Sequence, residues 1–394
     1  MLWIRRNLFR TWWDGVLTVV FGALSAWVIV NLVEFVFITG RWEIIEVNLK
    51  LLLVGQFPAE SLWMVEGSLV AIALWLAAAL GGKPKPVQEQ ESWPRRIWDI
   101  VQRFGLIIGL GFLLVVLAGP VESAPVATAV VVAIIVGRLL NTARHRIRVF
   151  GKVPALIWHL LLLSAPLALI SLTLMQSELS LWGGFLINFY MAIIAIVLCF
   201  PLGVLLALGR KSTLPIVRLI STTYIELIRG APLFVLLLLA GVALEFFIPS
   251  EVAPGSVFRA VTVFTLFTAA YLAEIVRGGL QSIPKGQLEA GKALGLSTVK
   301  ITFLITLPQA LRNVIPAQIG QFISLFKDTT LAGAALSIVE LLKVSEAITK
   351  QDDFLGQGYI YEALAFVSLL FWVGSYVMSR ESQRLEKRLG VGQR

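Results

Sequence analysis

Residues 288–308, LEAGKALGLSTVKITFLITLP, form a polar, glycine-broken stretch in a chain that is otherwise strongly apolar. Ser282 and Pro284, shortly before it, predict the start of a helix, because a serine cap and a proline in the first turn both favour one. Gly295 suits the left-handed conformation that commonly closes a helix. The sequence therefore predicts a short helix over about 285–294, which a glycine folds back sharply.

After this helix the sequence predicts a return to an apolar segment. Ser297 or Thr298 can begin the next helix, and Pro308 and Pro316 are expected to interrupt that segment. The short helix carries more apolar residues than a solvated loop requires: Leu288, Ala290, Ala293, Leu294 and Leu296. Such a helix suits the groove of another protein, but an ordinary helical connection between two spans explains the same residues equally well.

The composition of the whole chain indicates a membrane protein. Of its 394 residues, 58% are hydrophobic and 14% are charged, whereas a soluble domain carries about 25% charged residues. Four long stretches contain no Asp, Glu, Lys or Arg, at 15–33, 104–121, 153–177 and 179–209. Because about 20 apolar residues cross the hydrocarbon core as a helix that satisfies its own backbone, the predicted fold class is all-α, polytopic and membrane-spanning.

The spacing of the apolar segments predicts about ten transmembrane helices. They are expected at about 12–38, 62–82, 100–119, 123–138, 153–176, 184–209, 219–247, 258–280, 313–340 and 360–380. Most of the 33 Lys and Arg residues then fall on one side of the membrane, and the positive-inside rule places that side, with both termini, in the cytoplasm. Basic loops beside anionic membrane lipid explain the net charge of +9, so no nucleic-acid partner is expected.

The chain divides into an irregular N-terminal part and a more regular C-terminal part. The predicted parts are a membrane extension of about five spans at 1–180, a core module at 181–382 that contains a cytoplasmic loop at 282–308, and a basic cytoplasmic tail at 383–394. Within the extension, the segment 43–61 forms an outer loop and the polar segment 81–97 a cytoplasmic linker. Residues 43–54 alternate polar and apolar at helical spacing, so we expect this helix to lie flat on the outer membrane surface.

The spacing within the quoted stretch resembles the EAA signature of ABC-transporter importer permeases. The matching residues are Glu289, Ala290, Gly291, Gly295, Ile305, Leu307 and Pro308. In that family the loop is a coupling helix that docks into a cleft of the cytoplasmic ATPase, so the resemblance implies this role for these residues. One departure is Gly291, where the family often has alanine. The resemblance also implies a five-helix type I permease core in the C-terminal half.

Further stretches resemble permeases for polar amino acids, the histidine, glutamate and glutamine group. They are YIELIRGAPL at 224–233, YLAEIVRGGLQSIPKGQLEAGKALG at 271–295 and SLFKDTTLA at 324–332. The N-terminal extension and its long outer loop look like the larger permease of general L-amino-acid transporters. This resemblance implies a bacterial inner-membrane importer with a second related permease in a heterodimer, a periplasmic amino-acid-binding protein, and ATPase subunits that carry ATP and Mg²⁺. The chain itself has no Gly-rich phosphate loop of the Walker type, so we expect it to bind no cofactor and to be no enzyme.

Two successive spans of the core repeat the pattern E-x-x-R-G, as Glu226 with Arg229 and Glu274 with Arg277. An i, i+3 spacing places each pair on one helix face, and charge within a span should face the bundle or a watery cavity. The pairs are either self-neutralising structural ion pairs near the cytoplasmic helix ends or contacts on a substrate pathway. The second interpretation is attractive because a carboxylate and a guanidinium can hold the two charged ends of an amino acid.

Asp328, Thr329 and Thr330 follow Lys327 and form a third polar cluster, with hydroxyls, deeper along its span. These three residues are further candidates for contact with a substrate. Structural packing and pathway contact explain this cluster equally well.

Two other kinds of membrane protein fit the sequence less well. An ion-coupled secondary amino-acid transporter is the alternative, but it would place an isolated coupling carboxylate at the midplane and would leave the EAA stretch unexplained. A membrane-embedded enzyme needs a catalytic constellation, and His145 and His159 are the only histidines. With Cys199 as the single cysteine, no metal site and no internal disulfide are expected.

Overall fold

A computed structural model of the chain describes residues 10–58, 62–80, 124–146, 181–243 and 253–390, with four single positions between 158 and 168. The described residues form helices and turns without a β-strand, which confirms the all-α class. The α-helices are α2 (Trp12–Glu34), α3 (Glu43–Val54), α4 (Leu62–Leu80), α6 (Ala124–Arg146), α9 (Gly184–Arg210), α10 (Pro215–Gly230), α11 (Leu233–Leu238), α13 (Ser256–Gln281), α14 (Lys285–Ala293), α15 (Thr298–Ile301), α16 (Leu307–Asn313), α17 (Ile315–Asp328), α18 (Leu331–Leu336), α19 (Leu341–Ile348) and α20 (Ile360–Leu389). Three π-helical segments join them: η1 (Phe35–Thr39), η5 (Leu239–Ala243) and η6 (Thr302–Thr306).

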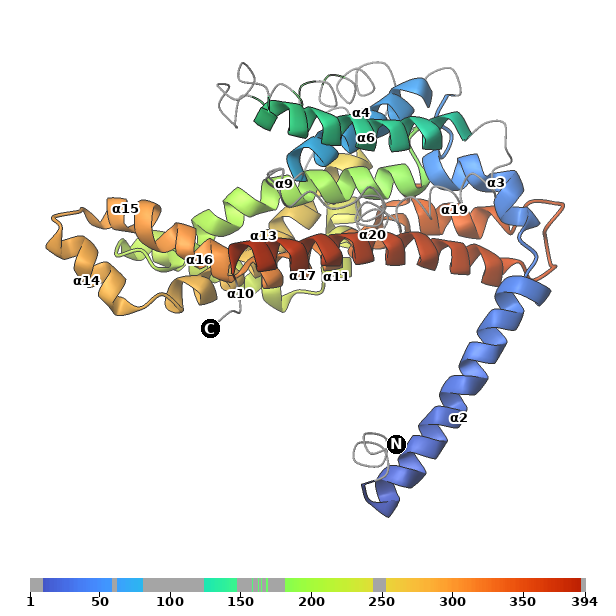
Figure 1. The fold of residues 1–394 in the computed structure, drawn as a ribbon, viewed down its shortest axis with the longest axis horizontal. Helices are drawn as coiled ribbons and strands as arrows, with labels where there is room; N and C mark the ends of the chain where they lie inside the picture. Colours follow the sequence, from blue (N-terminus) through green and yellow to red (C-terminus); the bar gives the residue numbers. More distant parts are fainter. Residues whose placement is uncertain are drawn as a thin grey trace.

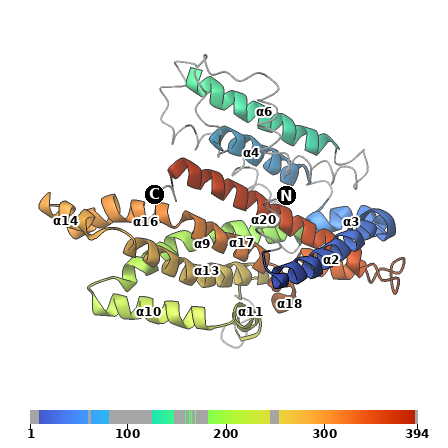
Figure 2. The same ribbon diagram turned by 60° about the horizontal axis from the view of Figure 1, so that its bottom comes forward.

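The core is a bundle of long helices, α9, α13, α17 and α20, that run side by side (Figure 1). α13 packs along α9 and α17 packs along α20, while α10 lies at the edge opposite α4 and α6 (Figure 2). A small residue allows the close approach of the first pair, because a Cβ added to Gly203 of α9 would stand 2.8 Å from the Leu272 side chain of α13. Close packing of small residues helps to join helices in a membrane. Lipid tails are as apolar as the side chains, so the hydrophobic effect does not drive helices together there.

Four described helices are long and apolar enough to cross a membrane, and each coincides with a predicted span. They are 12–39, 184–210, 256–281 and 360–387. α4 and α6, which pack against each other, occupy the predicted spans at 62–82 and 123–138, and those at 100–119 and 153–176 lie outside the described residues. A multi-span helical membrane protein is therefore confirmed, and the number of ten stays a prediction.

The predicted spans at 219–247 and 313–340 are not single straight helices. The first is α10 followed by α11 and η5, bent by 102°, because Pro232 lacks an amide and holds Ala231 in an extended conformation. The second divides into α17 and α18, and α18 ends at Ser337, whose φ of 56° is left-handed. A membrane tolerates such breaks only where protein or water covers the freed backbone groups.

α3 attaches the N-terminal extension to the core. The predicted amphipathic helix at 43–54 is present, but its apolar face is buried against α9, α19 and α20, through Ile44, Ile45, Leu49 and Leu52. Asn48 of α3 and Gln351 exchange two amide hydrogen bonds of 3.2 and 2.9 Å. Protein rather than lipid therefore covers the apolar face of this helix.

A buried polar network joins α9, the α17–α18 break and α19. Asn188 of α9 donates to Thr329 Oγ1 at 3.0 Å and to Glu340 Oε2 at 3.2 Å. Glu340, which is 1% exposed, caps α19 by accepting from the amides of Leu342 and Lys343 at 2.9 and 2.8 Å. Thr329, a candidate for substrate contact from the sequence, is fully buried here and takes part in helix packing.

We expect the Glu340→Ala variant to destabilise the fold. The change leaves two amides of α19 without their cap and removes an acceptor of Asn188, and a lost buried hydrogen bond to a charged group costs roughly 1.5–3 kcal/mol. Thermal unfolding of the purified protein in detergent measures the loss. Glu346→Ala, a half-buried position on the same helix, is the matched control and should unfold close to the wild-type temperature. Equal losses in the two variants would show that this network does not hold α19.

Candidate functional site

The stretch 288–308 lies at one end of the bundle, where α14 folds back toward α15, and α3 and α19 lie at the other end (Figure 1). α13 ends at Gln281, and Ser282 is its C-cap. α14 then begins at Lys285, directly after Pro284. The predicted short helix is confirmed, but its predicted serine cap is wrong, because Ser282 closes α13 instead.

Gly295 makes the sharp exit from α14. Its φ is +73°, a region that glycine enters at little cost and other residues rarely adopt. Ser297 caps the following helix, since its hydroxyl accepts from the Lys300 amide at 3.4 Å. The predictions of a left-handed Gly295 and of a helix that begins at Ser297 or Thr298 are therefore confirmed.

Gly291 lets α14 pack against the segment that comes after the turn. A Cβ at this position would stand 2.9 Å from Ile301 Cγ1 and 3.4 Å from Ile305 Cδ1, so the position has little room for a side chain. Leu307 is buried in the core beside α9 and α13. Gly291, Ile305 and Leu307 therefore pack inside the loop, and none of the three belongs to its exposed surface.

Glu289 and Ala290 lie on the outer surface of the loop, where both are exposed. Apolar side chains surround them, with Leu294 78% exposed and Leu288 42% exposed. Phe303 and Leu304 of η6 are also more than half exposed. The tip of the loop thus combines a carboxylate with an apolar surface.

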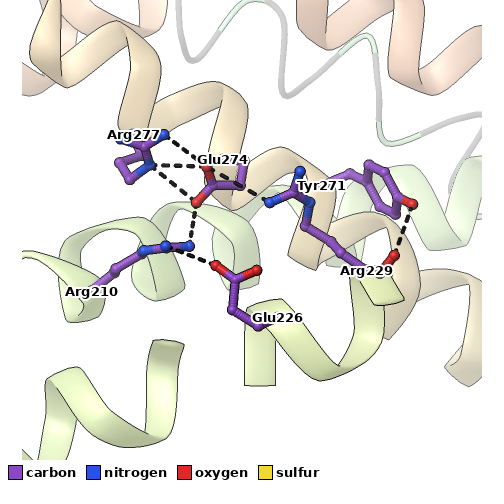
Figure 3. Close-up of polar contacts among 6 residues, drawn as sticks. All are labelled: Arg210, Glu226, Arg229, Tyr271, Glu274 and Arg277. Carbon is purple, nitrogen blue, oxygen red and sulfur yellow. Dashed lines mark hydrogen bonds and ion pairs between the residues drawn. The ribbon is translucent and has the colours of Figure 1, made fainter. Parts of the chain in front are cut away.

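A cluster of charged side chains joins α9, α10 and α13 (Figure 3). Glu274 of α13 accepts from Arg277 Nε at 2.9 Å and from Arg210 Nη1 at 2.5 Å, and Arg229 Nη1 lies 3.8 Å away. Arg210 also pairs with Glu226 at 2.8 Å. The predicted Glu274–Arg277 pair is confirmed, but the predicted Glu226–Arg229 pairing is replaced by contacts between helices.

The sequence pattern did not single out Arg210, which bridges both carboxylates. Its position in the sequence could have pointed to it, because Arg210 is the first charged residue after the charge-free stretch 179–209. With three guanidinium groups and two carboxylates, the cluster has a net charge of +1. Such a cluster holds α10 to the bundle near its bend at Gly230, where Tyr271 also donates to the Arg229 carbonyl at 3.4 Å.

The third polar cluster lies far from the first two. Thr329 contacts Asn188 and Glu274 contacts Arg210, and these two partners are 22 residues apart on α9, or about 33 Å along a helix. Asp328 is half-buried, and the Thr330 hydroxyl donates to the Lys327 carbonyl at 2.9 Å. The structure therefore does not bring all the candidate pathway residues into one site.

Comparison with known proteins shows which family the chain resembles. Residues 199–391 match the family described as the inner membrane component of binding-protein-dependent transport systems. The chain is 35% identical over 360 residues to the glutamate/glutamine/aspartate/asparagine transport system permease protein BztC of Rhodobacter capsulatus, which covers 88% of this chain and 78% of that protein. The chain belongs to this permease family.

Two further likenesses cover about half of the permease. It is 41% identical over 211 residues to the inner membrane amino-acid ABC transporter permease protein YhdY of Escherichia coli, across 54% of this chain and 57% of that protein. A solved structure, described as the crystal structure of an amino acid ABC transporter with histidines, aligns with 52% of this chain and 92% of its own, at 25% identity and a TM-score of 0.47. The match to BztC also includes much of the N-terminal extension.

We expect Glu274→Gln to destabilise the permease much more than Glu226→Gln does. The Glu274 side chain is 17% exposed and faces three guanidinium groups, whereas that of Glu226 is 55% exposed and pairs with one. Leaving buried charge unpaired costs roughly 3–5 kcal/mol, and an exposed pair contributes about 1 kcal/mol or less. Yield in the membrane and thermal unfolding of the two variants measure the difference. Similar values for both would contradict a central role for Glu274.

Proposed function

We propose that this permease carries polar amino acids across the bacterial inner membrane, driven by a separate ATPase that docks on α14. The names of its relatives support the substrate class, since BztC and YhdY are both amino-acid transport permeases. The exposed loop tip, with Glu289 between Leu288 and Leu294, carries the proposal for ATPase docking. ATP and its Mg²⁺ belong on the partner in this proposal, and this chain converts the movement of the partner into movement of its helices.

The orientation is inferred from the same loop. α14 faces the cytoplasm in this proposal, which agrees with the excess of Lys and Arg in the loops and termini on that side. Both termini are then cytoplasmic, and α3 with α19 lies at the periplasmic end. A periplasmic amino-acid-binding protein delivers the substrate there, consistent with the binding-protein-dependent family, and a second related permease completes the membrane part as a heterodimer.

The charge cluster is proposed to stabilise the bundle and to transmit the position of α14. Glu274 lies seven residues before the end of α13, about 10 Å along the helix, and α14 begins after a three-residue turn. A shift of α14 therefore acts on the helix that carries Glu274 and, through Arg210 and Arg229, on α9 and α10.

The substrate pathway is proposed to involve residues near the two helix breaks. At one break, Glu226 and Arg229 are partly exposed beside the bend between α10 and α11, with Glu274 and Arg277 behind them. At the other, Asp328 and Thr330 are half-buried at the end of α17. The first group lies toward the cytoplasmic end and the second toward the periplasmic end, so a substrate would meet them in succession.

We expect Gly295→Val and Glu289→Lys to abolish coupling without loss of the permease. Valine at Gly295 meets a φ of +73°, which distorts the exit from α14, and lysine at 289 reverses a charge at the docking surface. Both variants should reach normal levels in the membrane. They should either release the ATPase on purification or leave its activity unresponsive to the loaded binding protein, measured in proteoliposomes that have no ion gradient.

Two control variants make the same kinds of change, a glycine replacement and a charge reversal, at other positions. Gly286→Ala adds a methyl group to a helical glycine of α14 with open space around it, and Asp352→Lys reverses an exposed charge at the opposite end of the molecule. Gly286→Ala should keep the ATPase bound and ATP-driven uptake intact, and Asp352→Lys should keep the ATPase bound. Wild-type transport by Gly295→Val and Glu289→Lys would mean that the loop is only a connector.

We expect Asp328→Asn to reduce amino-acid uptake while the complex still assembles. A lost charge contact of about 1.4 kcal/mol corresponds to a tenfold change in affinity, which should lower the rate of uptake from saturating loaded binding protein by up to tenfold. Asp353→Asn, in an exposed loop, is the control and should transport normally. Unchanged uptake by Asp328→Asn would remove this residue from the pathway.

A further inference from the structure

A cavity of about 340 Å³ lies between α9, α17 and α20. Its apolar walls come from Ile196 of α9, Ile319 and Phe322 of α17, and Met378 and Leu385 of α20. The cavity is partly open to the surface of the bundle, and apolar atoms make up nearly all of its accessible wall. We propose that this cavity holds an acyl chain of one anionic phospholipid, whose headgroup is bound by the basic end of α20.

The residues that line the cavity cover about 10 Å along α20, from Met378 to Leu385, which corresponds to part of an acyl chain. Ile196 lies 14 residues before the end of α9, about 21 Å along the helix, which is near the middle of the span. Leu385, at the other end, lies only four residues before the end of α20. The cavity therefore lies between the middle of α9 and the C-terminal end of α20, and the assignment of this end to the cytoplasmic leaflet rests on the proposed function.

Basic residues lie beside the apolar cavity residues toward the C-terminal end of α20. Arg380 and Lys387 are exposed, and Arg384 forms an ion pair with Glu381 at the cavity rim. Glu386 is hydrogen-bonded to Ser382 at 2.7 Å.

α16 adds a further cation to this end of α20. Arg312 Nη2 lies 3.4 Å from where a Cβ on Gly390 would stand. With Arg312, the described charged side chains of this region are Arg380, Glu381, Arg384, Glu386 and Lys387, which give four positive and two negative charges. Basic pockets between membrane helices on the cytoplasmic side attract anionic headgroups.

A photo-crosslinking residue identifies the occupant directly. Benzoylphenylalanine replaces Phe322 in the complete transporter, the intact membrane is irradiated, and the mass of the crosslinked permease is measured. We expect an increase equal to one phospholipid. An adduct with the sister permease, or no adduct, would overturn the proposal. The same residue at Leu266, a partly exposed position on α13 outside the cavity walls, gives the background level of lipid labelling.

A second measurement tests the cavity and the headgroup separately. Purified complexes are reconstituted in nanodiscs of phosphatidylglycerol or phosphatidylcholine and then transferred to detergent, and the retained lipid is counted by native mass spectrometry. Wild type should retain one more phosphatidylglycerol per permease than Ile319→Trp, which places a larger side chain in the cavity. Ile193→Trp, on the exposed surface of α9, should retain the wild-type number.

The double variant Arg380→Gln/Lys387→Gln should keep a lipid but lose at least tenfold in preference for phosphatidylglycerol. Arg218→Gln/Lys211→Gln, which removes two exposed cations near α10, should keep that preference. Equal retention by wild type and Ile319→Trp, or an equal preference in both double variants, would overturn the site. ATPase coupling through α14 is measured independently, so failure of this site is distinguishable from failure of the proposed function.

Discussion

Glu274 is the acceptor that three helices of the core share. Arg277 donates to it from the same helix and Arg210 from α9, and Arg229 approaches it from α10. Charge in a membrane span is tolerated only where it is paired or hydrated, so each arginine constrains where its helix can lie. Without Glu274, three guanidinium groups would gather around a single, mostly exposed carboxylate, that of Glu226. The position of α10, an edge helix that bends by 102° just beyond Arg229, depends on this one side chain.

The opposite end of α9 is held by a different kind of polar contact. There Asn188 connects Thr329 with the buried carboxylate of Glu340, and the same carboxylate caps α19. Both networks lie beside helix breaks, which leave backbone groups without partners inside the membrane. α9 thus connects two broken spans, with an ionic contact at one end and a mainly amide and hydroxyl contact at the other.

The two glycines of the loop between α13 and α16 are required for different physical reasons. Gly295 is in the left-handed region, where a side chain is strained even though the space around it is open. Gly291 is in an ordinary helix, and the nearby Ile301 side chain leaves it no room for a larger residue. One glycine sets the direction of the chain and the other sets how closely α14 approaches the next segment. Together they present Glu289 and the exposed leucines on a short, rigid tip.

The sequence by itself determined the class, the principal spans and the loop. Uncharged stretches of about 20 residues leave a helix in lipid as the stable solution, and proline, glycine and serine at 284, 295 and 297 placed α14 and its turn to within a residue. Those signals are local, so they can be read along the chain. The pairing of charges was only partly local: the i, i+3 pattern predicted Glu274 with Arg277 correctly. It also predicted Glu226 with Arg229, but the folded chain brings Arg210 to Glu226 and directs Arg229 toward Glu274. The burial of Thr329 and the covering of α3 were likewise decided by tertiary structure, because each depends on which surface of another helix lies opposite.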